Sequence, residues 1–318
     1  MALTMLTGCA ERVRQHEFAA MSTVVRATVY HRRGPDWDAV ERAAREFAAQ
    51  YDHRDPASPV ARLNRDGNAQ LEPRAAETLR AALRLAAATG GAFDPTLLPV
   101  TRLWDFDHGG TLPEAAALAA ALERVDYRRL QVDAGGRATL QDAELDLGAI
   151  GKGAVVDHLA DWLAERGFER FLLEAGGDVL VSGLKPDTAP WRIWVRHPRQ
   201  ADLPLAIAAI GVAGGRVALA TSGDYERFFE QEGVRYHHIL NPATGRPDSD
   251  AVAVTVIAGS AIEADALATA LFVMGSAGGE LLAGYPGIEG VLIYRAGGEL
   301  AAVVSDGFPA QQGRVNVN

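Results

Sequence analysis

The chain has little cysteine, no excess of basic charge and no long apolar run. Its one cysteine, Cys9, excludes an internal disulfide and a thiolate metal cluster. Lysine and arginine number 31 against 41 aspartate and glutamate, a formal net charge of −10 that argues against a nucleic-acid binder. Without an uninterrupted apolar run of about 18 residues, we expect no transmembrane segment. An acidic chain can still hold an anionic ligand through backbone amides and a divalent cation.

The length and composition are ordinary for a globular protein with a large core. The chain has 318 residues, of which 48% are hydrophobic and 23% charged. Length alone indicates two domains, or one domain built from a duplication. We expect an N-terminal segment (1–15), one main, internally duplicated domain (16–310) and a C-terminal tail (311–318).

The first residues bear on the cellular location. Leu6–Cys9 (LTGC) looks like a lipoprotein processing box, but only eight residues precede Cys9, whereas a signal peptide needs about 15–30. We therefore expect a chance match and a cytoplasmic protein. The alternative is a lipid anchor through Cys9 on the outer face of the cytoplasmic membrane, if the first residue lies inside a longer precursor.

Strand and helix patterns alternate along the chain without a regular βαβ series. The stretch Glu17–Arg32 is rich in β-branched side chains and alternates in polarity, which predicts a strand. Apolar periodicity predicts helices at about 36–50, 74–88 and 113–124. From Phe171 onward, short strands are separated by glycine or proline turns. Hairpins and helix pairs of this kind favour an α+β fold over a doubly wound sheet.

The stretch EADALATALF (263–272) predicts a buried helix that carries a carboxylate. Ser260 and Glu263 form an S-x-x-E capping box, and the helix is apolar nearly all round. A buried carboxylate is costly unless it is paired or binds a metal, so Asp265 needs a partner. Thr269 follows at i+4 on the same face, so both side chains can give oxygens to one cation. The alternative is that both side chains bond to neighbouring backbone.

Two glycine-containing turns are further candidates for binding. In LDLGAIGKGAVVD (145–157) a strand delivers Asp146, and glycines let the backbone approach a ligand where a helix begins. Free amides at that helix start, together with Lys152, can bind an anion; the alternative is a tight turn with Lys152 in solvent. In GGAFDPT (90–96), Asp94 on its own fits a turn capped by its own side chain.

A third region combines hydroxyls, histidines and a carboxylate. TSGDYERFF (221–229) contains Asp224, and YHHILNPATGRP (236–247) contains His238 at the end of a predicted strand. A lone histidine is more often structural, and no three or four residues have the spacing of a zinc site. An oxygen-ligated cation such as Mg²⁺ fits the composition better.

Taken together, these stretches resemble the ApbE family, the FAD:protein FMN transferases. The resemblance runs in order from about Met21 to Met274, most of the chain. Its landmarks are MST (21–23, where the family usually has MGT), SPVARLN (58–64), GGAFDPT (90–96), LDLGAIGKG (145–153), LLEAGGDVLVSG (172–183), ATSGDY (220–225), HILNPATGRP (238–247) and ADALATALFVMG (264–275).

The resemblance implies tandem α+β units of the T-fold type, with antiparallel sheets, helices and an FAD cleft between the units. It implies transfer of the FMN part of FAD to a Ser or Thr hydroxyl of a target protein, with release of AMP. Some members instead hydrolyse FAD to FMN and AMP. A target would carry a D-x-x-[ST]-[GS]-A-[ST]-like motif, which this chain lacks, so we expect no self-flavinylation.

The resemblance also assigns site residues. The family's Mg²⁺ ligands correspond to the side chains of Asp265 and Thr269 and the carbonyl of Ala149. Its histidine, with a proposed role in activating the attacking hydroxyl, is His238, and we expect Asp224 to orient it. The flavin contacts correspond to a set of eight residues: Met21, Tyr51, Ala92, Phe93, Asp94, Asp146, Lys152 and Ile239.

Two departures from the family pattern concern the site. Ser22 replaces the usual glycine near the flavin. Ala268 stands where some members carry a further acidic residue, so the sequence predicts a metal site with one carboxylate. An FAD pyrophosphatase that uses the same residues is the alternative activity. A non-catalytic flavin-binding protein would be expected to lose Asp265, Thr269 or His238, and all three are present.

Overall fold

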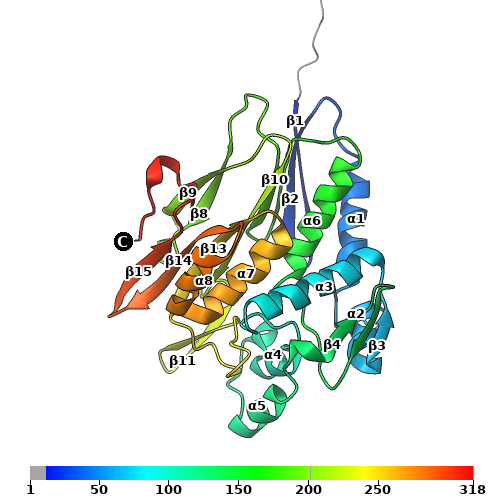
Figure 1. The fold of residues 1–318 in the computed structure, drawn as a ribbon, viewed down its shortest axis with the longest axis vertical. Coiled ribbons are helices and arrows are strands. Elements are labelled where there is room, and N and C mark those ends of the chain that lie inside the picture. The colour runs from blue at the N-terminus through cyan, green and yellow to red at the C-terminus, as the bar shows by residue number, and fades with distance from the viewer. Residues whose placement is uncertain (1–11, 201, 318) are drawn as a thin grey trace, which may run out of the picture.

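The computed structural model describes residues 12–200 and 202–317. Cys9 and the lipoprotein-like box lie outside the described residues. A single eight-stranded sheet, antiparallel throughout, runs through the centre of the molecule (Figure 1). Its strands are β1 (Arg12–Ala20), β2 (Thr23–His31), β6 (Phe171–Ala175), β7 (Asp178–Ser182), β10 (Arg216–Gly223), β13 (Ala251–Ala258), β14 (Glu289–Ala296) and β15 (Glu299–Val304). The α+β prediction is confirmed.

The order of these strands across the sheet is their order along the chain. Each half of the sheet consists of two strands, an intervening helical segment and two more strands. The helix α6 (Gly151–Ala164) comes between β2 and β6, while α7 (Ala261–Met274) and α8 (Gly278–Gly284) come between β13 and β14. This arrangement matches the tandem units that the resemblance implies, and it places α6 against α7.

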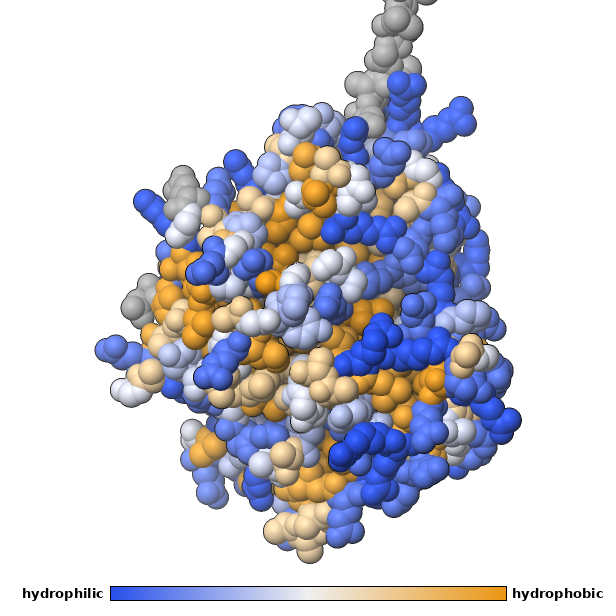
Figure 2. Space-filling model, in the orientation of Figure 1, coloured by the Kyte–Doolittle hydropathy of each residue, from blue (hydrophilic) through white to orange (hydrophobic). Residues whose placement is uncertain are grey.

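Helices cover one face of the sheet. The remaining helices are α1 (Trp37–Ala49), α2 (Pro59–Asp66), α3 (Pro73–Ala88), α4 (Leu98–Trp104) and α5 (Ala115–Leu122). The main core lies between the sheet and α1, α3, α6 and α7. Figure 2 shows this helical face, where hydrophilic side chains gather along the edge formed by α1.

The other face of the sheet packs on a hairpin, β8 (Trp191–Arg196) with β9 (Pro204–Ile210), which forms a second core. The C-terminal segment lies along β9, where Asn316 N–H donates to the Leu205 carbonyl at 2.6 Å. Two small sheets complete the fold: β3 (Asn68–Gln70) with β5 (Arg137–Leu140) and β4 (Leu130–Val132), and β11 (Phe228–Gln231) with β12 (Val234–His237). Short 3₁₀ turns occur at Phe106–His108, Tyr127–Arg129, Gly275–Ala277 and Gln311–Gly313.

The helix α7 is a core helix, as its sequence predicts. It packs on β10, β13 and α6, and nine of its residues are buried. By length and composition alone, the segment Ala261–Gly284 would be long and apolar enough to cross a membrane. Packing between the sheet and α6 accounts for that composition here, because a helix with apolar residues on every side is typical of a protein core.

The stretch Glu17–Arg32 is not one strand, so this prediction is wrong. It belongs to the hairpin of β1 and β2, which turns at Met21 and Ser22. Both turn residues have positive φ, 54° and 56°, as a two-residue hairpin turn of the I′ type requires. Glycine and asparagine are the usual residues in such turns, so Met-Ser gave no turn signal. Ser22 occupies the position where the family usually has glycine.

Replacing Ser22 by glycine is therefore expected to stabilise the protein. A non-glycine residue in the left-handed region costs roughly 1–2 kcal/mol of stability, and glycine removes this cost. Part of the gain is offset because glycine has greater conformational freedom in the unfolded chain. We expect Ser22→Gly to raise the free energy of unfolding by about 0.5–1 kcal/mol, measured by urea denaturation. Ser22→Ala keeps the left-handed cost and serves as the control. A loss of stability in Ser22→Gly would contradict this assignment of strain.

Candidate functional site

The start of α7 is fixed by two side chains. Ser260 Oγ accepts the Glu263 N–H at 3.2 Å, which is one half of the predicted capping box. Asp157, from the middle of α6, accepts the N–H groups of Ala261 and Ile262 at 2.9 Å each. These bonds satisfy amides that a helix start otherwise leaves without partners. Burial raises the pKa of Asp157 to about 6, against the effect of these two bonds. The middle of α6 is thereby joined to the first turn of α7.

The glycine at position 153 permits this contact. A Cβ added to Gly153 would lie 2.4 Å from the carbonyl oxygen of Ala261. The Gly153 N–H points to α7 and donates to Asp265 Oδ2 at 3.2 Å. In a regular helix that N–H would bond the carbonyl four residues earlier, which is Ala149. Among the described residues no donor to the Ala149 carbonyl is found, so this oxygen is left available to a ligand.

Two aspartates and a lysine meet at the start of α6. Lys152 Nζ lies 3.3 Å from Asp178 Oδ2 and 3.3 Å from Asp265 Oδ1. The two carboxylates are buried, with 2% and 4% of Asp178 and Asp265 exposed. Burial raises the pKa of Asp178 well above its usual range, and the charge of Asp265 adds to this effect. Burial alone lowers the pKa of Lys152, but the charges of Asp178 and Asp265 outweigh it and leave that pKa raised.

A hydroxyl pair lies one helical turn along α7. Thr269 Oγ1 is 3.2 Å from Ser222 Oγ at the end of β10. Within residues 12–200 and 202–317, no three His, Cys, Asp or Glu side chains form a metal-binding group. A cation at Asp265 would therefore take a carboxylate, a hydroxyl and a backbone carbonyl, and complete its shell with ligand or water oxygens. These donors fit Mg²⁺, which prefers oxygen and commonly shares its ligands with phosphates.

Two of the predicted flavin-binding loops lie side by side. The N–H of Asp146 donates to the Pro95 carbonyl at 2.8 Å, which joins the turn before α6 to the loop after α3. Asp94 accepts from the N–H and hydroxyl of Thr96, at 2.8 and 2.6 Å, and from the Tyr127 N–H at 2.9 Å. Burial raises the pKa of Asp94, and these bonds oppose the rise. The Asp94 carboxylate thus shapes its own loop, as an Asx turn does.

The other predicted flavin contacts are largely apolar. Phe93 and Ile239 are buried, while Ala92 and Met21 are half-buried and pack against the main core. Tyr51 is only 8% exposed, and its hydroxyl donates to Thr78 Oγ1 at 2.9 Å. The hydroxyl of Tyr51 is therefore used inside the core.

The imidazole of His238 is held in one tautomer. Its Nδ1 lies 3.1 Å from the carbonyl oxygen of Arg227, and its backbone N–H donates to the same oxygen at 3.0 Å. A carbonyl only accepts, so Nδ1 carries the proton and Nε2 keeps a free lone pair. Burial, aided by the charges of Arg227 and Lys152, lowers the pKa of His238 to about 3.

Asp224 does not orient His238, so this prediction is wrong. Its carboxylate is fully buried and binds Arg199 through two hydrogen bonds of 2.8 and 2.6 Å. Arg295, from β14, donates to the same carboxylate at 2.6 Å. The two arginines lower the pKa of Asp224 against the effect of burial. Both come from distant parts of the chain, and no local pattern in the sequence predicts them.

The sequence interpretation missed Asp178 and Ser222 as members of the site. Both lie within the landmarks LLEAGGDVLVSG and ATSGDY, but only as parts of strands. A signal for Asp178 was present in the sequence, because it opens a predicted strand whose other residues are apolar or small; the structure buries all five residues of that strand. The reasoning that gave Asp265 a partner applies equally to this carboxylate.

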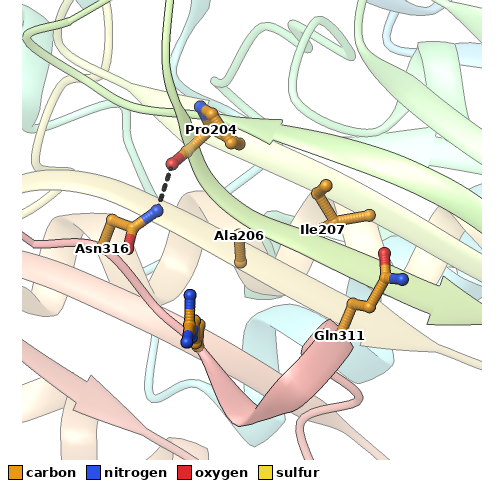
Figure 3. Close-up of a pocket in the computed structure, with 6 residues that line it drawn as sticks. Pro204, Ala206, Ile207, Gln311 and Asn316 are labelled. Atoms are coloured by element: carbon orange, nitrogen blue, oxygen red, sulfur yellow. Dashed lines mark hydrogen bonds between the residues drawn. The ribbon is translucent and has the colours of Figure 1, made fainter.

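A separate pocket lies at the β8–β9 hairpin, which packs on the other face of the sheet from α6 and α7. Figure 3 shows it between β9 and the C-terminal segment, where Asn316 Nδ2 donates to the Pro204 carbonyl at 3.0 Å. It is lined by Pro204, Ala206, Ile207, Gln311, Arg314 and Asn316. This set has no carboxylate and no histidine, so it offers neither a cation site nor a base. The aspartate–lysine cluster remains the candidate site.

The fold and this site define the class of protein. The ApbE family profile matches residues 21–292, so the chain belongs to the ApbE family. A relative from Treponema pallidum, named FAD:protein FMN transferase, is 36% identical over 236 residues; these cover 68% of this chain and 64% of the relative. A relative of the same name from Vibrio cholerae is 36% identical over 234 residues, or 71% of this chain and 69% of the relative.

Solved structures agree with this assignment. The ApbE protein of Thermotoga maritima superposes with a TM-score of 0.83 at 30% identity, covering 93% of this chain and 97% of that one. The apo form of the Pseudomonas stutzeri flavinyl transferase ApbE gives a TM-score of 0.79, also at 30% identity, over 93% and 96% of the two chains. The resemblance in the sequence is confirmed.

The protonation state of His238 is open to direct measurement. With a pKa of about 3 in the folded protein, His238 is expected to remain the neutral Nδ1–H tautomer from pH 8 down to pH 5. Because an unfolded histidine takes up its proton near pH 6.5, the unfolded chain binds more protons below that pH. This histidine therefore lowers stability as the pH falls from about 6.5 toward 3. Long-range ¹H–¹⁵N NMR spectra of the imidazole test this, and a titration midpoint between pH 5 and 7 would contradict it.

Proposed function

We propose that this protein transfers the FMN part of FAD to a Ser or Thr hydroxyl of a target protein, in a reaction that depends on Mg²⁺ and releases AMP. The observation that carries the proposal is the junction of α6 and α7, where the Asp265 carboxylate meets Lys152 and the Gly153 N–H. The names of the relatives, FAD:protein FMN transferase, support the same activity.

In the proposed reaction, the target hydroxyl oxygen attacks the phosphorus of the FMN half of FAD. The bond from that phosphorus to the bridging oxygen breaks, and AMP leaves with the bonding electrons. The free Nε2 of His238 accepts the proton of the attacking hydroxyl. A pKa of about 3 makes His238 a weak base in the free protein. The negative diphosphate of bound FAD would raise that pKa, because an opposite charge favours the protonated form.

The charges of the site suit a diphosphate. When bound, Mg²⁺ would neutralise charge on the phosphoryl oxygens and help to align the diphosphate. Asp265 and Thr269 would hold it with the Ala149 carbonyl. Lys152, with 30% of its side chain exposed, supplies a second positive charge at the start of α6, where the helix dipole also favours an anion.

The second candidate is an FAD pyrophosphatase, in which water replaces the target hydroxyl. The position of His238 favours neither activity, since the same base would serve either nucleophile.

For the cellular location, we propose a cytoplasmic protein. The alternative is a protein anchored to the outer face of the cytoplasmic membrane by a lipid on Cys9.

Product analysis separates the two activities. The protein is incubated with FAD, Mg²⁺ and a target that carries the D-x-x-[ST]-[GS]-A-[ST]-like motif, and AMP and free FMN are quantified by chromatography. The transferase predicts AMP without an equal amount of free FMN, because the flavin stays on the target. Equal amounts of both products, with or without target, would identify the pyrophosphatase. No turnover of FAD would contradict both.

A further inference from the structure

Asp178 is a buried carboxylate to which neither the sequence pattern nor the family resemblance gives a role. It is 2% exposed at the first position of β7, a central strand of the sheet between β6 and β10. Its Oδ2 atom is buried and has no hydrogen-bond partner among the described residues. The ion pair to Lys152 Nζ at 3.3 Å is the contact that this oxygen makes. A buried oxygen of this kind is available to a ligand.

The backbone holds Asp178 in this position. Gly176 and Gly177 form the turn from β6 to β7 with φ values of 56° and 95°, which favour glycine. Asp178 pairs with Ala175 directly after the turn, and Val179 pairs with Leu219 of β10. A shift of one residue would turn every side chain of β7 to the other face of the sheet. The strand pairing therefore fixes Asp178 on the face of the sheet that packs on α6 and α7.

The surroundings of Asp178 resemble a cation site in which an ammonium holds the place of the cation. Lys152 Nζ lies between two carboxylates, 3.3 Å from each. The Gly153 N–H, which in a regular helix would bond the Ala149 carbonyl, is turned to Asp265, so that carbonyl just before α6 has no backbone donor among the described residues. Two buried carboxylates around one lysine leave a net negative charge when both are ionised, and a divalent cation would offset it.

We propose that Asp178 is the second carboxylate of the cation site, and that in the protein without metal the Lys152 ammonium pairs with both carboxylates in the place of the cation. This inference rests on the proposed cation site at Asp265. Some family members carry a further acidic residue where this chain has Ala268. In this chain, the second carboxylate would come from Asp178 on β7 instead of from α7. Cation binding and the ion pairs of Lys152 then compete.

The test is Mn²⁺ binding to the protein without FAD, followed by electron paramagnetic resonance of the free ion. Asp178→Asn is expected to raise the dissociation constant for Mn²⁺ at least tenfold, as Asp265→Asn does. The matched control is Asp161→Asn, which removes a carboxylate from the same helix as Lys152. Asp161 pairs with Arg74 and Arg216 and lies about 13 Å along α6 from Lys152, so its loss should leave Mn²⁺ binding unchanged.

The removal of Asp178 alone leaves Lys152 with one partner and can impair folding. A second comparison therefore uses Lys152→Gln, which is expected to bind Mn²⁺ at least as tightly as the wild type because the competing ammonium is gone. The double variant Lys152→Gln/Asp178→Asn removes both buried charges together, and it should bind Mn²⁺ at least tenfold more weakly than Lys152→Gln alone.

The outcomes separate this inference from the proposed function. The role of Asp178 is overturned if Asp178→Asn binds Mn²⁺ with wild-type affinity, or if Lys152→Gln and the double variant bind it equally well. In either case Asp265→Asn would still weaken Mn²⁺ binding, and the proposed cation site would stand. If Asp265→Asn leaves Mn²⁺ binding unchanged, the proposed cation site itself fails. Neither result depends on flavin transfer, because no FAD is present.

Discussion

Replacing Asp265 by alanine is expected to abolish Mg²⁺-dependent turnover of FAD while the fold survives. Asp265 is the carboxylate of α7 that meets Lys152 and the Gly153 N–H of α6, and cation stabilisation of phosphoryl charge contributes several kcal/mol. A loss of that size corresponds to a rate roughly a thousandfold lower. Release of AMP from FAD, followed by chromatography, gives the rate, and circular dichroism reports the fold.

Two controls sharpen this prediction. Asp265→Asn keeps the shape of the side chain and removes only its charge, so it should be almost as inactive as the alanine variant. Asp161→Asn removes a carboxylate from the distant ion pairs with Arg74 and Arg216, and its activity should equal that of the wild type. If Asp265→Ala turns over FAD at the wild-type rate with Mg²⁺ present, the metal assignment is wrong.

The second large effect is expected at Gly153. An alanine Cβ there would meet the backbone of α7, at 2.4 Å from the Ala261 oxygen and 2.8 Å from the Ile262 nitrogen. Backbone atoms cannot yield as a flexible side chain does, so α6 and α7 must move apart. We expect Gly153→Ala to lower the free energy of unfolding by about 1–3 kcal/mol and to weaken the bond from residue 153 to Asp265. Urea denaturation and the FAD turnover assay measure the two effects.

Gly151 provides the matched control, because it flanks Lys152 on the other side. A Cβ added to Gly151 has no heavy atom within 4 Å, so alanine fits at this first residue of α6. Gly151→Ala should raise the free energy of unfolding by about 0.4–1 kcal/mol by restricting the unfolded chain, with turnover retained. Equal stabilities for the two alanine variants would show that the close approach of α6 to α7 is not needed.

The sequence predicted those parts of the fold and site that depend on local patterns. The apolar periodicity and the capping residue Ser260 predicted α7 as a buried helix, and the structure confirms both. The burial of Asp265 implied a partner, which proves to be Lys152 together with the Gly153 N–H. These predictions succeeded because helix caps and helix periodicity involve residues only a few positions apart.

The parts that the sequence did not predict depend on contacts between distant segments. Asp178 reaches Lys152 only because β7 pairs between β6 and β10 beneath α6. Asp224 is held by Arg199 and Arg295, which come from the β8–β9 connection and from β14. Contacts between such distant segments leave no pattern of residue spacing in the sequence. Reasoning from local patterns therefore paired Asp224 with His238 and gave Asp178 no role. The pairing order of the sheet decides both.

The central claim is that a protein hydroxyl, and not water, accepts the FMN part of FAD. The most direct measurement is the intact mass of a target protein after incubation with this protein, FAD and Mg²⁺. We predict a gain of one FMN phosphoester on the target, and no gain when the acceptor Ser or Thr is replaced by alanine. Release of AMP with an unchanged target mass would contradict the claim.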